Sequence, residues 1–193
     1  MDLVLDLNKR YTYADYLTWI DDKSRELING FIKMFPSPLS AHARITRRCL
    51  RSFEEFIENN GYGFEVFHAP FDVILFKGEY DPKKIDTVVQ PDVFVVCDTS
   101  KIQSRGCFGT PDLIIEVLSS FTSKRDLNDK FNLYQEYGVK EYWVVYPQDK
   151  QVQIFLLKEN GKFNEGTFYE STTVSATVIP RFQMALDYMF SNL

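Results

Sequence analysis

A carboxylate interrupts an otherwise apolar segment of this chain. Residues 113–118 read LIIEVL, which is typical of a buried strand except for Glu116. An ionised carboxylate buried without a partner costs several kcal/mol, comparable to the net stability of a small domain. We therefore expect a cation, a metal ion or a raised pKa to compensate Glu116, and each of these would make it a candidate for chemistry. The alternative is an edge strand on which Glu116 faces water.

Two further residues could complete a hydrolytic site. Asp92 follows Pro91 and opens a predicted strand at 93–96, and Lys130 lies on a predicted helix after the Glu116 strand. Magnesium and manganese favour oxygen ligands, often one or two carboxylates with water and a substrate phosphate, and they acidify the attacking water. The pattern predicts Asp92 and Glu116 as ligands. Lys130 would position or activate the water, or neutralise charge on the phosphate.

Asp112 competes with Asp92 for the first position, since it also follows a proline. On one extended strand Asp112 and Glu116 would lie about 13 Å apart, which is too far for one metal ion. A neighbouring strand could place Asp92 at roughly 5 Å from Glu116. We therefore prefer Asp92, although an aspartate at a strand entrance can also be a simple turn residue.

Two amphipathic helices are predicted around these residues. Residues 40–59 have an apolar face and a second face carrying Arg44, Arg47, Arg48 and Arg51, which is either a solvated surface or a weak nucleic-acid contact. In the helix at 124–137, Lys130 lies about 60° from the apolar line, so it could reach the sheet. It could equally form an exposed i,i+4 pair with Asp126, worth about 0.3–0.5 kcal/mol.

The remaining pattern predicts an α/β protein. We expect a helix from Thr12 to Ile20, a hairpin at 26–34 turning at Asn29-Gly30, and strand structure at 64–76 that is continuous or bent. Residues 141–146 and 152–157 predict another hairpin, and 160–193 further short strands with a terminal helix. A glycine-containing loop at 106–109 lacks the Lys-Ser/Thr of a phosphate-binding loop.

Composition narrows the class of protein. The chain has 193 residues, 45% hydrophobic residues and a net charge of −5. We expect one globular domain with no membrane span, and nucleic-acid contact would need a local basic patch because the net charge is negative. Three widely spaced cysteines argue against disulfides or a zinc cluster and favour a reducing cytoplasm.

The sequence resembles the Uma-two family of restriction endonuclease-like proteins within the PD-(D/E)XK nuclease superfamily. The resemblance lies in Pro91-Asp92, the EVLS segment at 116–119, the segment 126–134, GVKEYWVV at 138–145, and ELING at 26–30 with His42. It implies a restriction endonuclease-like core over 1–193, a mixed central sheet flanked by helices, with the N-terminal helix and hairpin at 1–38 as an extension.

That resemblance also implies an activity and roles for residues. It implies a divalent-metal-dependent endonuclease with DNA as the expected substrate. The implied catalytic residues are Asp92, Glu116 and Lys130. The implied ligands of Mg or Mn are Asp92, Glu116 and the Val117 carbonyl. The lysine that superfamily members carry two residues after the glutamate is Leu118 here, so Lys130 would replace it. Glu26, His42 and Asp126 are the implied supporting residues, and a homodimer is an analogy with the superfamily.

Two other functions remain open from the sequence. The displaced lysine and negative net charge are compatible with a non-catalytic module that keeps the fold to bind nucleic acid or protein. A metal-dependent hydrolase of another phosphoester would use the same residues. Metal binding separates the first alternative from an enzyme, and substrate profiling separates the second.

Overall fold

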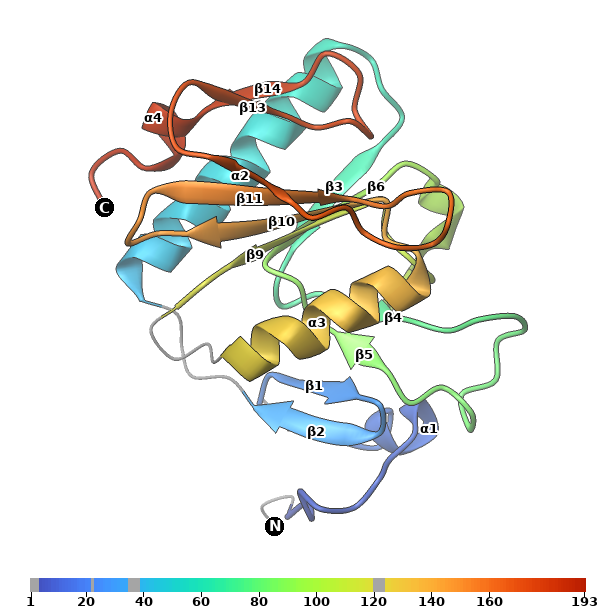
Figure 1. The fold of residues 1–193 in the computed structure, drawn as a ribbon. Helices are drawn as coiled ribbons and strands as arrows, with labels where there is room; N and C mark the ends of the chain where they lie inside the picture. Colours follow the sequence, from blue (N-terminus) through green and yellow to red (C-terminus); the bar gives the residue numbers. More distant parts are fainter. Residues whose placement is uncertain (1–3, 22, 35–38, 120–123) are drawn as a thin grey trace.

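Two mixed β-sheets and the helices around them organise the protein (Figure 1). The computed structural model describes residues 4–21, 23–34, 39–119 and 124–193, without the side chains of 124–126. The central sheet has the order β12-β11-β10-β9-β6-β3, and the second sheet the order β2-β1-β5-β4-β8-β7. A small sheet pairs β13 with β14.

Most strands are short. The central sheet contains β3 (Glu65–His68), β6 (Val93–Val96), β9 (Leu113–Val117), β10 (Glu141–Tyr146), β11 (Gln151–Leu156) and β12 (Thr167–Tyr169). The second sheet contains β1 (Arg25–Ile28), β2 (Phe31–Met34), β4 (Val73–Ile74), β5 (Val88–Val89), β7 (Ile102–Gln103) and β8 (Gly106–Phe108). The small sheet contains β13 (Thr173–Ser175) and β14 (Gln183–Ala185). The helices are α1 (Tyr13–Tyr16), α2 (Ser40–Asn59), the 3-10 turn η1 (Thr99–Lys101), α3 (Lys124–Tyr137) and α4 (Leu186–Met189).

The alternation of side chains along β9 determines which layer each residue meets. Ile115 lies in the core cluster that β9 shares with α2, whereas Ile114 lies in the cluster shared with α3. Glu116 has the same parity as Ile114, so its side chain points towards α3. Both faces of β9 are therefore covered, which explains why the strand is almost uniformly apolar.

Helix α3 lies between the two sheets (Figure 1). Leu133 and Tyr134 of α3 share one core cluster with Phe94 and Ile114 of the central sheet and with Ile28 of the second sheet. The opposite face of the second sheet packs against α1 and the N-terminal segment, through residues that include Tyr13 and Leu27. A side chain on α3 can consequently reach both sheets.

Several predicted elements are confirmed. Helix α2 and helix α3 have the predicted bounds, and the hairpin of β1 and β2 turns at Asn29 and Gly30, whose φ angles are +50° and +83°. Positive φ at both positions is what a two-residue hairpin of this type requires. The expected mixed sheet flanked by helices is also present.

Other expectations about local structure were wrong. Helix α1 ends at Tyr16 rather than Ile20, although Thr12 forms a full capping box with Asp15. Residues 64–76 form two short strands rather than one continuous strand, and β3 joins the central sheet whereas β4 joins the second sheet. The β7–β8 hairpin was not expected from the loop-like composition of its surroundings.

Candidate active site

The two predicted acidic residues meet at one end of the central sheet. Strands β6 and β9 are antiparallel with Val93 opposite Ile115, so one further step of this register places Asp92 opposite Glu116. Asp92 Oδ2 accepts a hydrogen bond of 2.7 Å from the Val117 N–H, which holds the aspartate against β9. Both side chains have the parity that points to the α3 face of the sheet.

Lys130 links Glu116 to the second sheet. Its Nζ lies 2.8 Å from Glu116 Oε1 and 3.0 Å from Glu26 Oε1. Glu26 is carried by β1, so this ammonium group joins residues from both sheets and from α3. Only 12% of the Lys130 side chain is exposed, which excludes the alternative of a solvated surface pair.

Charge and burial act against each other at Glu116. Burial raises the pKa of this carboxyl, Lys130 lowers it, and the negative charges of Asp92 and Glu26 raise it again, with a net value of about 7. For Lys130, burial lowers the pKa, but Glu116 and Glu26 raise it more strongly. Lys130 therefore carries its proton at neutral pH.

Tyr134 of α3 is a further site residue that was not among the residues predicted from the sequence. Its hydroxyl donates a 2.6 Å hydrogen bond to Glu116 Oε1, the same oxygen that contacts Lys130. The signal was the i,i+4 spacing of Lys130 and Tyr134, which puts the two side chains side by side on a helix. Glu116 is thus oriented by two donors from one helix.

His42 reaches Asp92 from the first turn of α2. Its Nε2 lies 3.0 Å from Asp92 Oδ2. Burial lowers the pKa of His42, but the hydrogen bond to Asp92 and the charges of Asp92 and Glu116 outweigh it, so the net pKa is raised. A protonated His42 would neutralise part of the acidic cluster.

A series of hydrogen bonds connects Glu26 with Gln90, Asp72 and Tyr16. The Gln90 N–H donates to Glu26 Oε1 at 2.8 Å, and the Gln90 side-chain amide donates to Asp72 Oδ1 at 2.8 Å. The Tyr16 hydroxyl also donates to Asp72 at 3.0 Å. Nothing in the sequence pattern indicated that these three residues support the site, because each is an ordinary polar residue in an irregular or short element.

Two buried atoms of the cluster remain without a hydrogen-bond partner among the described residues. They are Glu26 Oε2 and His42 Nδ1. Buried polar atoms are usually paired with protein, water or an ion. Their presence beside Asp92 and Glu116 is what a site that receives water or substrate would show.

Asp112, the competitor, has a different role. Its Oδ2 accepts from the Cys97 N–H at 2.8 Å and its Oδ1 contacts Lys140 Nζ at 2.6 Å. It lies at the start of β9, whereas Glu116 lies near the end. The structure thus places Asp92, not Asp112, next to Glu116.

The arginines of α2 lie apart from this cluster. Arg44 and Arg48 donate to the carbonyls of Asn192 and Met189, and Arg51 pairs with Glu55. Relative to His42, the four arginines are rotated by roughly 120–180° around the helix, so they face away from the acidic residues. Asp126 is part of α3, but its side chain lies outside the described residues.

Comparison with known protein families shows which family this chain belongs to. The model of the Uma2 family, described as "Putative restriction endonuclease", matches residues 13–187. The chain belongs to the Uma2 family. The matched region contains every residue of the cluster just described.

A solved structure supports the fold of this Uma2 protein. The crystal structure of a protein described as "a putative nuclease belonging to DUF820" from Anabaena variabilis aligns with a TM-score of 0.72 and 18% identity, covering 94% of this chain and 98% of that one. At this identity the likeness shows a shared restriction endonuclease-like fold. No match was found among curated proteins. No helix in the described part of the chain is long and apolar enough to cross a membrane.

The donor set of this Uma2 protein can be compared with what a divalent cation needs. No group of three or more His, Cys, Asp or Glu side chains in the described residues is arranged to hold a metal ion. Asp92 Oδ1 and Glu116 Oε2, however, have no hydrogen bond from the described residues, since Val117, Tyr134 and Lys130 use the other oxygen of each carboxylate. Two carboxylates with water and phosphate fit magnesium, which seldom takes an all-protein cage.

Proposed function

We propose that this Uma2 protein is a divalent-metal-dependent endonuclease that hydrolyses phosphodiester bonds of DNA at the cluster of Asp92, Glu116 and Lys130. The proposal rests on the positions of Asp92 and Glu116, which lie opposite each other at the ends of two adjacent antiparallel strands. The Lys130 ammonium lies 2.8 Å from Glu116. The family to which the chain belongs supports a nuclease, and the choice of DNA comes from the resemblance to the superfamily.

Asp92 and Glu116 would hold Mg or Mn, with the Val117 carbonyl as a third protein ligand. When bound, the ion would acidify a water molecule and neutralise charge on the phosphate. Asp92 is fixed for this task by the Val117 N–H, and Glu116 by the Tyr134 hydroxyl. These hydrogen bonds leave one oxygen of each carboxylate without a donor among the described residues.

Lys130 would act as a cation rather than as a base. Because its raised pKa keeps it protonated, it has no lone pair to accept a proton from water. It can hold Glu116 in place, donate a hydrogen bond to a phosphate oxygen or water, and stabilise charge that develops in the transition state. Glu26 and His42 would be positioning residues, acting through Lys130 and Asp92.

Contact with the DNA backbone is proposed for α2. Arg47, Arg48 and Arg51 line a hollow of about 360 Å³ with Tyr188 and Ser191. This local positive charge on a protein of net charge −5 is the kind of patch that phosphate contact requires. Since the hollow faces away from His42, it would bind DNA outside the cleavage site. A cytoplasmic location and a homodimer remain predictions.

The decisive experiment compares cleavage of plasmid and single-stranded DNA by the wild type and single variants. Asp92→Asn and Glu116→Gln should each lower the rate by about a hundredfold or more, because metal-linked charge stabilisation contributes several kcal/mol. Glu136→Gln is the matched control, since Glu136 lies on α3 in an exposed pair with Lys77. Full activity in an Asp92→Asn, Glu116→Gln double variant would contradict the proposal.

A non-catalytic binding module is the second candidate. It is favoured by the absence of a three-residue metal group in the described residues and by the position of Lys130 between Glu26 and Glu116, which already neutralises them in part. Calorimetric titration with magnesium and manganese separates the two candidates. Binding that disappears in Glu116→Gln supports the nuclease, and no binding of either ion supports the module.

A further inference from the structure

A second polar hollow lies on the opposite face of the second sheet from the acidic cluster. On β1, Ile28 belongs to the core facing α3, and Glu26 shares its parity, whereas Leu27 belongs to the core facing α1. The hollow is lined by Tyr13 and Phe108, which pack on that α1 side. It is therefore separated from Lys130 by the thickness of a sheet.

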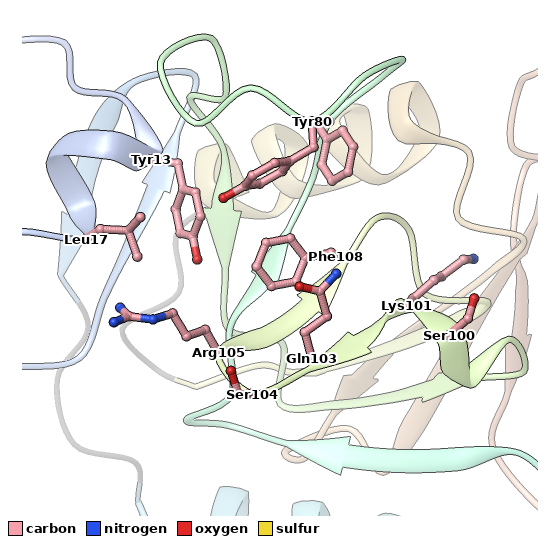
Figure 2. A pocket seen from close by; sticks show the side chains of 10 residues that line it. Tyr13, Leu17, Tyr80, Ser100, Lys101, Gln103, Ser104, Arg105 and Phe108 are labelled. Atoms are coloured by element: carbon pink, nitrogen blue, oxygen red, sulfur yellow. The ribbon is translucent and has the colours of Figure 1, made fainter.

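The hollow combines aromatic rings with cations. Its volume is about 700 Å³, within the usual range for sites that bind small organic molecules. Figure 2 shows the rings of Tyr13, Tyr80 and Phe108 grouped on one side, with Arg105 extending beneath Leu17 and Tyr13. The Tyr80 ring packs against Phe108 at a centroid distance of 5.5 Å. Tyr80 is nevertheless 49% exposed, so ring surface remains for a ligand.

The charged groups that line the hollow are both positive. They are Lys101 and Arg105, and neither Asp nor Glu is among the lining residues that the structure describes. Lys101 Nζ donates to the Thr110 carbonyl at 2.8 Å, which leaves two of its three N–H groups. Arg105 makes no hydrogen bond or ion pair with any described residue, so its guanidinium fork remains available for an anion.

The position of Arg105 is set by rigid backbone. Arg105 lies in the two-residue turn of the β7–β8 hairpin, directly before Gly106. Gly106 has φ of +146°, and a Cβ there would lie 2.4 Å from the Asp72 carbonyl oxygen. Next to this close approach, the Cys107 N–H donates a hydrogen bond to the Asp72 carbonyl oxygen, and this bond holds the hairpin beside β4. The guanidinium thus projects from a well-supported turn.

We propose that this hollow binds a nucleotide, with its base against Tyr80 and its phosphate on Arg105. Base stacking on aromatic side chains and bidentate contacts from arginine to phosphate are the two interactions that such groups offer. A purely apolar ligand would remove water from Arg105 without giving it a partner. The nucleotide can be free or part of a single strand. The site goes beyond the proposed cleavage site, and binding there requires no cleavage.

The test is calorimetric titration of the Glu116→Gln protein, with chelator present, using adenosine monophosphate and a short oligothymidylate as probes. Tyr80→Leu and Arg105→Ala should each weaken binding by about tenfold, the equivalent of about 1.4 kcal/mol. Tyr80→Phe should keep the affinity because the ring remains. Lys83→Ala is the matched control, since it removes an exposed positive charge outside the lining of the hollow.

Each outcome of these titrations either supports or contradicts the proposed nucleotide site. Binding of the monophosphate that depends on Tyr80 and Arg105 identifies a free nucleotide as a ligand, and the same dependence for the oligonucleotide identifies a strand. Failure of both probes to bind, or equal effects of Arg105→Ala and Lys83→Ala, would overturn the proposal. Because the Glu116→Gln background is used, these outcomes are independent of whether the protein cleaves DNA.

Discussion

At the scale of single residues, the acidic cluster is a balance of buried charges. Three carboxylates, Glu26, Asp92 and Glu116, are offset by Lys130 and, when protonated, by His42. A buried pair of this kind adds little net stability relative to apolar residues, but removal of one partner is costly because the other charge stays buried. The cluster is therefore better explained by chemistry than by stability.

Replacing Lys130 tests this balance. Lys130→Met should lower the free energy of unfolding by about 3–5 kcal/mol, because Glu26 and Glu116 lose the cation they share. Urea unfolding with a chelator present measures the change. Lys77→Met, which breaks an exposed pair with Glu136, should cost at most about 1 kcal/mol.

The interaction can then be assigned to the pair by a double variant. At a pH above the raised pKa of Glu116, adding Glu116→Gln to Lys130→Met should restore part of the lost stability, because one unpaired charge is removed. If Lys130→Met cost no more than Lys77→Met, the charges of the cluster would have to be solvated, against the burial seen here.

At the scale of elements, Asp112 connects the central strands at the end opposite the cluster. It accepts from the Cys97 N–H just after β6 and from Lys140 just before β10, while it precedes β9 itself. Burial raises the pKa of Asp112, but the hydrogen bonds from Lys140 and Cys97 lower it more, so the net pKa is lowered. This carboxylate therefore stabilises the folded state when it is ionised.

Asp112→Asn should cost about 1–2 kcal/mol at neutral pH, because the amide cannot match an ionised partner for Lys140. Since the folded pKa is depressed, the difference between wild type and variant should be complete above the unfolded pKa of about 3.9. It should disappear as the pH falls through the lower folded pKa. Urea unfolding at a series of pH values measures it, and a difference that grew in acid would have the wrong sign.

Gly106 gives a second prediction at this scale. Gly106→Ala should destabilise the protein by more than about 2 kcal/mol, because the added Cβ meets the Asp72 carbonyl and the second sheet must shift. Gly78→Ala is the control, because Gly78 also has positive φ but has nothing within 4 Å of an added Cβ. Thermal unfolding of the two variants measures how much crowding and the larger φ of Gly106 cost beyond a positive φ at an open site, and equal losses would mean that neither matters at Gly106.

At the scale of the whole molecule, α3 and its partners hold two sheets together around the proposed metal site. An ion that binds only the folded protein stabilises all of it, by about 2.7 kcal/mol at a hundredfold excess over its dissociation constant. Saturating magnesium or manganese should therefore raise the melting temperature of the wild type. The Asp92→Asn, Glu116→Gln double variant should show no increase, and an equal increase there would mean that the ion binds elsewhere.

Much of the local structure could be predicted without coordinates. Helix α2, helix α3 and the hairpin at Asn29-Gly30 follow from apolar periodicity and turn chemistry, which are properties of neighbouring residues. The β7–β8 hairpin and the division of β3 and β4 between two sheets could not be predicted in this way. Short strands are defined by the partners they pair with, and those partners are distant in sequence.

The same distinction applies to the candidate site. A glutamate within an apolar strand required compensation, and the sequence alone was sufficient to select Glu116, Asp92 and Lys130 as candidates. Only the tertiary structure decided that Glu26 shares the same ammonium group, that Tyr134 orients Glu116, and that the α2 arginines face away. Burial can be inferred from the residues next to a side chain in sequence, but the identity of a partner depends on how helices and sheets from distant parts of the chain pack together.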